Sequence, residues 1–142
     1  MTPAVKKILL VRSGAEHYAF DMTAVQEAVY DPDLTVLPQL KGFITGTCLW
    51  RDKQVPVIDL GFFLGKTTPA QSGDIVITII SGSEVGFLVD EIGPIVEVPT
   101  DSLITVDKNL ARQEGKVLQA FDRGGELVFI VETAAMAKYL SQ

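Results

Sequence analysis

The chain has 142 residues with 47% apolar content, enough for one compact unit with a sizeable core, which excludes an intrinsically disordered protein. Its net charge is −6 and its 12 Lys and Arg residues are scattered, which excludes a basic nucleic-acid-binding surface. No apolar run approaches the roughly 18 residues of a membrane-spanning helix and no signal-peptide pattern is present, which indicates a cytoplasmic protein without direct membrane insertion.

The first half of the sequence alternates short apolar runs with turns, a pattern typical of β-strands. Predicted strands occupy residues 7–12, 18–21, 28–37, 44–50 and 54–60. One helical turn is expected over residues 22–27, where Thr23 and Gln26 have the spacing of a weak capping box. A polar turn at Asp52-Lys53 joins the last two of these strands into a hairpin.

The second half continues the strand pattern after a polar connector at residues 66–73. Predicted strands occupy residues 74–80, 85–98, 116–122 and 126–132, and the second of them bends at Gly93-Pro94. Gly124-Gly125 suits a tight primed turn between the last two strands. A helical turn is expected near Ser102, and residues 133–140 are predicted to form a C-terminal helix.

Several features occur twice in the same order and predict an internal repeat. An SGxE turn at residues 13–16, and again at 81–84, lies between apolar runs, and a strand ending in Asp follows each copy. The segment over residues 49–65, a hairpin followed by a short apolar cap, has a weaker echo at 120–132. We therefore predict an all-β fold with two small β-barrels of about four or five strands each, within one domain over residues 1–142.

The sequence carries few groups suited to catalysis or metal binding. Its single cysteine and single histidine, Cys48 and His17, lie far apart in the sequence, and Cys48 falls in an apolar strand typical of a buried, inert thiol. Residues 64–67 lack the first glycine and the helix of a phosphate-binding loop. Asp90 and Glu91 are adjacent on a predicted strand, so their side chains are expected to point to opposite faces. We expect no enzymatic activity, no metal and no cofactor, and a protein as the partner.

Three segments are informative in combination: residues 18–29 (YAFDMTAVQEAV), 46–64 (GTCLWRDKQVPVIDLGFFL) and 86–92 (GFLVDEI). Together they resemble the bacterial chemotaxis coupling proteins, the CheW family. The corresponding family segments are a strand leading into VxEI, a Gly-x-x-Asn-Leu-Arg-Gly-x-x-x-Pro-x-x-Asp-Leu hairpin, and a Gly-x-x-Val-Asp-x-Val strand. The resemblance extends from about Ile8 to Leu140, which is nearly the whole chain.

The resemblance implies two intertwined five-stranded SH3-like β-barrels with short helical turns and a C-terminal helix. The barrel subdomains would cover approximately residues 14–66 and 74–132, with the terminal segments packing across them. It also implies a non-catalytic adaptor that binds the regulatory domain of a CheA-type histidine kinase and the cytoplasmic tip of chemoreceptors. A groove between two barrels can hold a receptor helix by its apolar anchors, and the barrel ends offer a separate apolar surface for the kinase.

The resemblance also assigns candidate partner-binding residues. Arg51 matches the family's hairpin arginine, which contacts the receptor, while Val25 and Glu27 match the VxE positions and Gly46 matches the first glycine of the hairpin. Trp50 would be a natural interface anchor if its side chain is exposed beside Arg51. Structural alternatives stay open here: Val25 as a core residue, Glu27 as a solvated charge and Arg51 as a residue that serves the turn.

The hairpin also departs from the family pattern. Where the family has Asn-Leu-Arg-Gly, this chain has Leu49-Trp50-Arg51-Asp52, and Asp reaches the expected turn geometry less easily than Gly. The departure leaves a second function open beside that of a chemotaxis adaptor. The alternative is a diverged CheW-like scaffold for pilus-based motility or another sensory array, with or without self-association.

Overall fold

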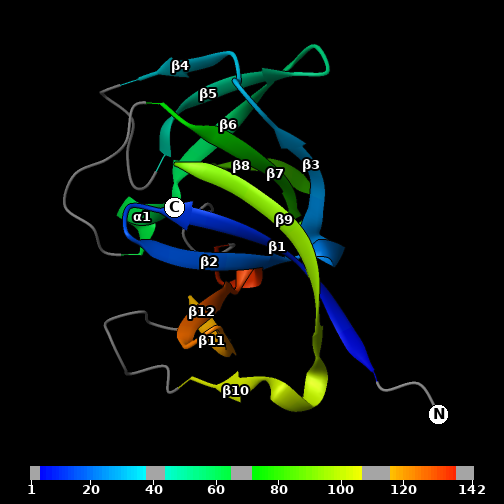
Figure 1. Cartoon of the computed structure of the whole chain (residues 1–142). Helices are drawn as coiled ribbons and strands as arrows, with labels where there is room; N and C mark the ends of the chain where they lie inside the picture. Colours follow the sequence, from blue (N-terminus) through cyan, green and yellow to red (C-terminus); the bar gives the residue numbers. More distant parts are fainter. Residues whose placement is uncertain (1–3, 38–43, 65–71, 107–115, 137–142) are drawn as a thin grey trace.

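The computed structural model describes residues 4–37, 44–64, 72–106 and 116–136, which form two mixed six-stranded sheets (Figure 1). Sheet A contains, in spatial order, β10 (Ile104–Thr105), β11 (Val117–Arg123), β12 (Glu126–Val131), β2 (Glu16–Asp21), β1 (Val5–Ser13) and β9 (Glu91–Pro99). Sheet B contains, in spatial order, β3 (Val25–Val29), β7 (Asp74–Ile80), β8 (Ser83–Val89), β6 (Lys53–Asp59), β5 (Ile44–Trp50) and β4 (Leu34–Val36). The predicted predominance of β-strands is confirmed.

Within the described residues, four short helices accompany the strands: η1 (Met22–Ala24), α1 (Leu60–Phe63), η2 (Thr100–Ser102) and η4 (Thr133–Met136). In the part of the chain that the structure describes, no helix is long and apolar enough to cross a membrane. The predicted connector at residues 66–73 falls largely outside the described residues, as do residues 137–140 of the predicted C-terminal helix.

Each sheet joins a hairpin from one half of the chain to a hairpin from the other half. In sheet A the β1–β2 and β11–β12 hairpins meet through a parallel pairing of β2 with β12, in which Tyr18 lies opposite Phe129. In sheet B the β7–β8 and β5–β6 hairpins meet through a parallel pairing of β8 with β6, in which Gly86 lies opposite Val57. The two copies of the sequence repeat therefore occupy equivalent places in the two sheets.

This exchange of hairpins places strands from residues 14–66 and from residues 74–132 in each sheet. Residues 74–89 form β7 and β8 and pair within sheet B, whereas β2 pairs with β1 and β12 in sheet A. The chain crosses from sheet B to sheet A at Asp90, between β8 and β9. The single strand predicted over residues 85–98 is therefore two strands in different sheets.

Strands in the middle of the protein are apolar on both faces because each separates two hydrophobic clusters. Along β1, Leu9 and Val11 enter the central cluster between the sheets, while Ile8 and Leu10 enter a cluster formed by sheet A alone. This alternation follows from the two-residue period of a strand. A third cluster is enclosed by sheet B and includes Trp50. The continuous apolar runs in the sequence are thus strands buried on both sides.

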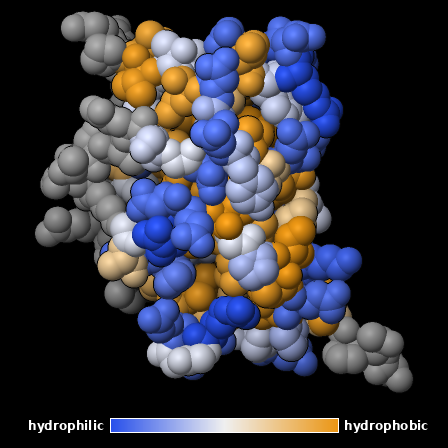
Figure 2. All heavy atoms as spheres, turned by 45° about the horizontal axis from the view of Figure 1, so that its top comes forward, coloured by the Kyte–Doolittle hydropathy of each residue, from blue (hydrophilic) through white to orange (hydrophobic). Residues whose placement is uncertain are grey.

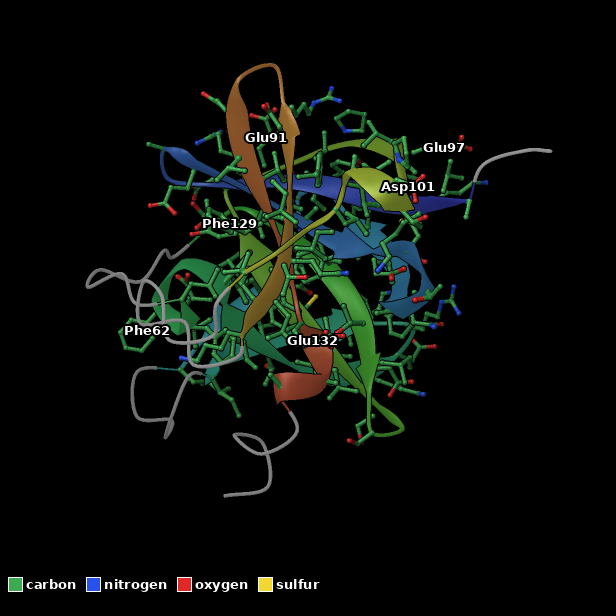
Figure 3. All side chains as sticks on the ribbon, turned by 90° about the horizontal axis from the view of Figure 1, so that it is seen from below. Phe62, Glu91, Glu97, Asp101, Phe129 and Glu132 are labelled. Carbon is green, nitrogen blue, oxygen red and sulfur yellow. The ribbon has the colours of Figure 1, made fainter. Side chains whose placement is uncertain are left out.

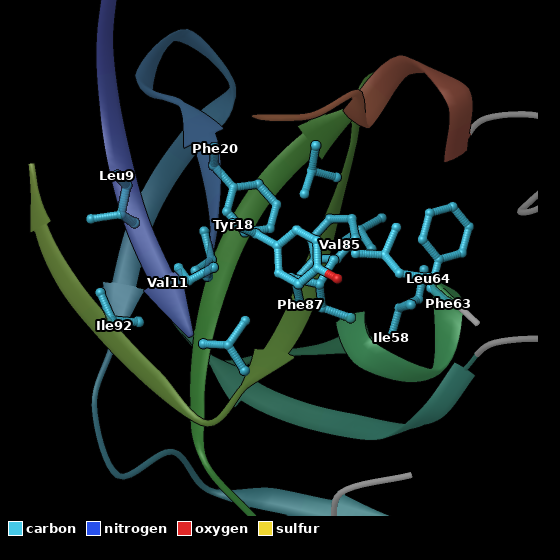
Figure 4. Close-up of a cluster of buried hydrophobic side chains, with 14 of the residues drawn as sticks. Leu9, Val11, Tyr18, Phe20, Ile58, Phe63, Leu64, Val85, Phe87 and Ile92 are labelled. Carbon is cyan, nitrogen blue, oxygen red and sulfur yellow. The ribbon is translucent and has the colours of Figure 1, made fainter. Parts of the chain in front are cut away.

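The central cluster holds the two sheets together, as Figure 4 shows. The ring of Phe20 on β2 lies 5.1 Å, centroid to centroid, from the ring of Phe87 on β8. Both side chains are fully buried. Tyr18 of sheet A and Val85 of sheet B lie in the same cluster (Figure 4). The interface between the sheets is therefore a hydrophobic core in its own right, and we expect the sheets to unfold together.

The predicted helical turns are present but differ in detail. The turn expected over residues 22–27 ends at Ala24, and it is capped by Asp21, whose carboxylate accepts the backbone N–H of Thr23, rather than by a Thr23–Gln26 box. The turn expected near Ser102 is η2. In Figure 3 its Asp101 lies on the same side of the molecule as Glu97, opposite Phe62. Asp59 ends β6 and caps α1 by accepting the backbone N–H of Phe62.

Charged side chains stabilise the crossover between the sheets at Asp90. The Asp90 carboxylate accepts the backbone N–H of Gly14 at 2.6 Å and lies 3.7 Å from Nη1 of Arg12. Nη2 of the same guanidinium lies 3.5 Å from the Glu91 carboxylate. The expectation that Asp90 and Glu91 point to opposite faces was wrong, because the chain bends at Asp90 and both carboxylates reach Arg12.

Candidate functional site

The site begins at the tight turn between β5 and β6, which lies one residue earlier than predicted. Its two central residues are Arg51 and Asp52, with φ angles of 49° and 62°, and Lys53 already belongs to β6. Positive φ at both positions is the geometry of a type I′ turn, which matches the right-handed twist of the flanking strands. The departure from Gly to Asp52 seen in the sequence therefore places a side chain where glycine is best suited.

We expect Asp52→Gly to stabilise the protein by about 0.5 kcal/mol, since glycine has no Cβ to oppose a left-handed backbone. Denaturant-induced unfolding measures the change. Gly125→Asp is the reciprocal control, because Gly125 occupies the second position of the β11–β12 turn, where both central residues also have positive φ and Gly125 has φ 92°, and this variant should lose stability. A loss of stability in Asp52→Gly would contradict the expectation.

Glu27 connects this turn to the opposite edge of sheet B. Its Oε2 accepts a hydrogen bond from Nε1 of Trp50 at 3.0 Å, and its Oε1 lies 3.2 Å from Nη2 of Arg51. β3 is the last strand on one side of the sheet, and β5 is next to the last strand on the other. The contact between side chains of β3 and β5 therefore indicates that sheet B curls so that its two ends approach each other.

Trp50 and Arg51 play different parts in this arrangement. The Trp50 side chain is buried, at 7% exposure, in the cluster enclosed by sheet B, so it is not the exposed anchor that the sequence left open. The Arg51 side chain is 67% exposed, and its guanidinium carbon lies 4.6 Å from the centre of the Trp50 ring. A guanidinium over an indole face is favourable because the ring quadrupole attracts the cation.

The other two candidates, Val25 and Gly46, are placed by packing rather than by charge. Val25 is half-buried at the start of β3 and packs against the central cluster, which agrees with its core alternative. Gly46 lies in β5, where a Cβ would come within 2.1 Å of the Thr35 backbone oxygen in β4. The absence of a side chain at Gly46 thus permits the close approach of β4 and β5.

One pair near the turn escaped the sequence analysis. Nζ of Lys53 lies 3.2 Å from the Glu84 carboxylate, which joins β6 to β8 at the same end of the sheet as the Arg51 turn. The parallel pairing of β6 with β8 was not predicted, so nothing in the sequence indicated that Lys53 and Glu84 lie side by side.

The view over the top of Figure 1, where β4 and β5 lie, shows hydrophilic side chains with apolar side chains exposed among them (Figure 2). Exposed apolar residues of sheet B include Leu49 and Ile79.

The thiol of the single cysteine lies away from solvent. Cys48 is fully buried, and burial raises the pKa of its thiol, with a further contribution from the nearby Asp33 charge. A thiol with a raised pKa stays protonated and unreactive near neutral pH. Among the described residues, no group of three or more His, Cys, Asp or Glu side chains is arranged to hold a metal ion.

Two intertwined β-sheets with a preorganised charged cluster at one end define a small β-rich protein whose candidate site is a binding surface. The family description "CheW-like domain" matches residues 7–140, so this chain belongs to the CheW-like family of scaffold and adaptor proteins. It is 25% identical over 126 residues to a chemotaxis protein CheW from Thermotoga maritima, covering 82% of this chain and 83% of that protein. It also resembles the crystal structure of the scaffolding protein TtCheW from Thermoanaerobacter tengcongensis, with a TM-score of 0.80, 26% identity and coverage of 92% and 90% of the two chains.

Proposed function

We propose that this protein is a non-catalytic adaptor of the cytoplasm that couples chemoreceptors to a CheA-type histidine kinase. The observation that carries the proposal is the CheW-like match across residues 7–140, which includes every strand from β2 to β12. Its partners would be the regulatory domain of the kinase and the cytoplasmic tip of the receptors. The curling of both sheets would complete two SH3-like barrels, each with a surface of its own.

The Glu27–Trp50–Arg51 cluster supports a receptor contact at the β5–β6 turn. Arg51 is the exposed member of the cluster and would touch the receptor, while Glu27 would hold the guanidinium in place. Val25 would border the contact at the start of β3. A prepositioned arginine loses less side-chain freedom on binding, and arginine is enriched among residues that dominate binding energy.

Arg51→Glu tests the receptor contact. It replaces an attraction by a repulsion between Glu27 and the new carboxylate, so we expect binding to a receptor-tip fragment to weaken at least about tenfold, or about 1.4 kcal/mol. Binding to the kinase regulatory domain should stay unchanged. Both are measured by calorimetric titration of wild type and variant. Lys53→Glu is the matched control, because it reverses a charge two positions away with the same change in net charge.

The same titrations distinguish the chemotaxis adaptor from the alternative, a diverged CheW-like scaffold. Its supporting observation is the departure at residues 49–52, where the family turn glycine is Asp52. Wild-type protein that binds neither the kinase domain nor the receptor tip at high micromolar concentration would contradict the adaptor proposal. Light scattering over a concentration series would then show whether the protein self-associates.

A further inference from the structure

We propose that Trp50 is a positioning residue that holds Glu27 and Arg51 in the geometry presented to a partner. The proposal rests on the proposed function in that this cluster is taken to face the receptor. Trp50 itself is buried and would make no contact with the partner. It would act through the two charged groups that it touches.

The indole N–H of Trp50 holds one oxygen of the Glu27 carboxylate. Indole nitrogen can only donate a hydrogen bond, and a buried donor without an acceptor is costly. Trp50 satisfies this need with Oε2 of Glu27 at 3.0 Å, a bond strengthened by the negative charge. Since Oε1 of Glu27 is bound by Arg51, the carboxylate is fixed from both sides. The orientation of Glu27 thus depends on a side chain inside sheet B.

The face of the Trp50 indole contacts the Arg51 guanidinium. The Arg51 guanidinium lies 4.6 Å from the ring centre, and its Nη2 lies 3.2 Å from Glu27. Two contacts at different points hold a planar group in one orientation. A guanidinium has five N–H donors, so Arg51 can keep the Glu27 contact and still donate hydrogen bonds to a partner.

A second ion pair at the same end of sheet B lacks this support from an aromatic side chain. Lys53 and Glu84 approach each other as closely as Arg51 and Glu27, at 3.2 Å. That pair has no aromatic ring and no buried N–H donor among its described contacts. An exposed pair of this kind holds its geometry only weakly. The leucine of the family's Asn-Leu-Arg-Gly pattern could supply neither contact, so the support from Trp50 is a feature of this chain.

The free protein provides the direct test, because Trp50 is the only tryptophan and gives one indole N–H resonance in NMR spectra. Glu27→Ala should shift that resonance and speed its exchange with solvent. In wild type the side-chain protons of Arg51 should be shifted upfield by the ring. Trp50→Phe keeps a ring and should retain much of this shift, whereas Trp50→Leu should abolish it. An indole resonance unmoved in Glu27→Ala would overturn the proposal.

Binding to the receptor-tip fragment gives the second readout. Trp50→Phe should weaken it about three- to tenfold through loss of a charge-assisted hydrogen bond, and Trp50→Leu should weaken it further. Lys53→Ala, which breaks the neighbouring pair, should leave binding unchanged. Thermal melting checks that each variant is folded. If a folded Trp50→Leu variant binds the receptor-tip fragment with the same affinity as wild type, the proposal is overturned. If wild type binds no receptor fragment, the NMR results still decide whether Trp50 positions the pair, so the two proposals fail separately.

Discussion

Substituting Gly46 with alanine is expected to destabilise the protein by about 3 kcal/mol and to lower its melting temperature by roughly 10 °C. A Cβ at this position would lie 2.1 Å from the Thr35 backbone oxygen and 3.0 Å from the Val36 Cα. Both atoms belong to the backbone of β4, so no rotamer change relieves the clash. β4 must move away from β5 or lose its pairing.

Thermal melting followed by circular dichroism measures this loss. Gly82→Ala is the control, because a Cβ there meets no atom within 4 Å although φ is 83°. It should cost only the left-handed backbone penalty, about 1 kcal/mol. Equal losses in the two variants would contradict the close approach of β4 and β5. A large loss in Gly46→Ala would support a packing role for this residue rather than a partner contact.

Replacing Phe87 with alanine is expected to cost about 4 kcal/mol, because the side chain is fully buried and the surrounding residues can fill the cavity only in part. Its ring packs on Phe20 of the other sheet, so the loss falls on the interface between the sheets. We expect both sheets to be destabilised together. Unfolding should remain a single transition at a lower denaturant concentration.

Two probes can follow this transition separately. Trp50 fluorescence reports on the core of sheet B, and far-ultraviolet circular dichroism reports on all strands. Their midpoints should coincide in wild type and in Phe87→Ala, as two-state unfolding requires. Leu127→Ala, at a position 51% exposed, should change stability by less than about 0.5 kcal/mol. Separate midpoints in wild type would show that each sheet folds on its own.

Most strands were predictable from the sequence because the signals that form them are local. β5 and β6 were predicted to within a residue from short apolar runs bounded by turns, and the Gly124-Gly125 turn has the positive φ angles expected of it. Asp59 caps α1 through a bond to the backbone of Phe62, only three residues away in the sequence. The strand predicted over residues 85–98 was wrong at Asp90, because the strand pattern resumes directly after the crossover between the sheets.

The candidate site was predictable only in part. A resemblance to known hairpins singled out Arg51, Trp50 and Glu27, but nothing in the residues showed that these side chains touch. Strand alternation could not decide whether Trp50 was exposed, because Trp50 is the last residue of β5. The burial of the ring and its bond to Glu27 depend on how far sheet B curls. The close packing of β4 on Gly46 also became visible only in the folded structure.

The sequence by itself determined most of the strands, the kinds of turn between them and the family, since periodicity and turn chemistry involve neighbouring residues. Only the tertiary structure decided which hairpins share a sheet. The parallel pairings of β2 with β12 and of β6 with β8 join segments far apart in the chain, and no local signal encodes them. Those pairings bury the central strands on both faces. The curl of sheet B brings Glu27, Trp50 and Arg51 together, because only the folded sheet brings β3 and β5 into contact.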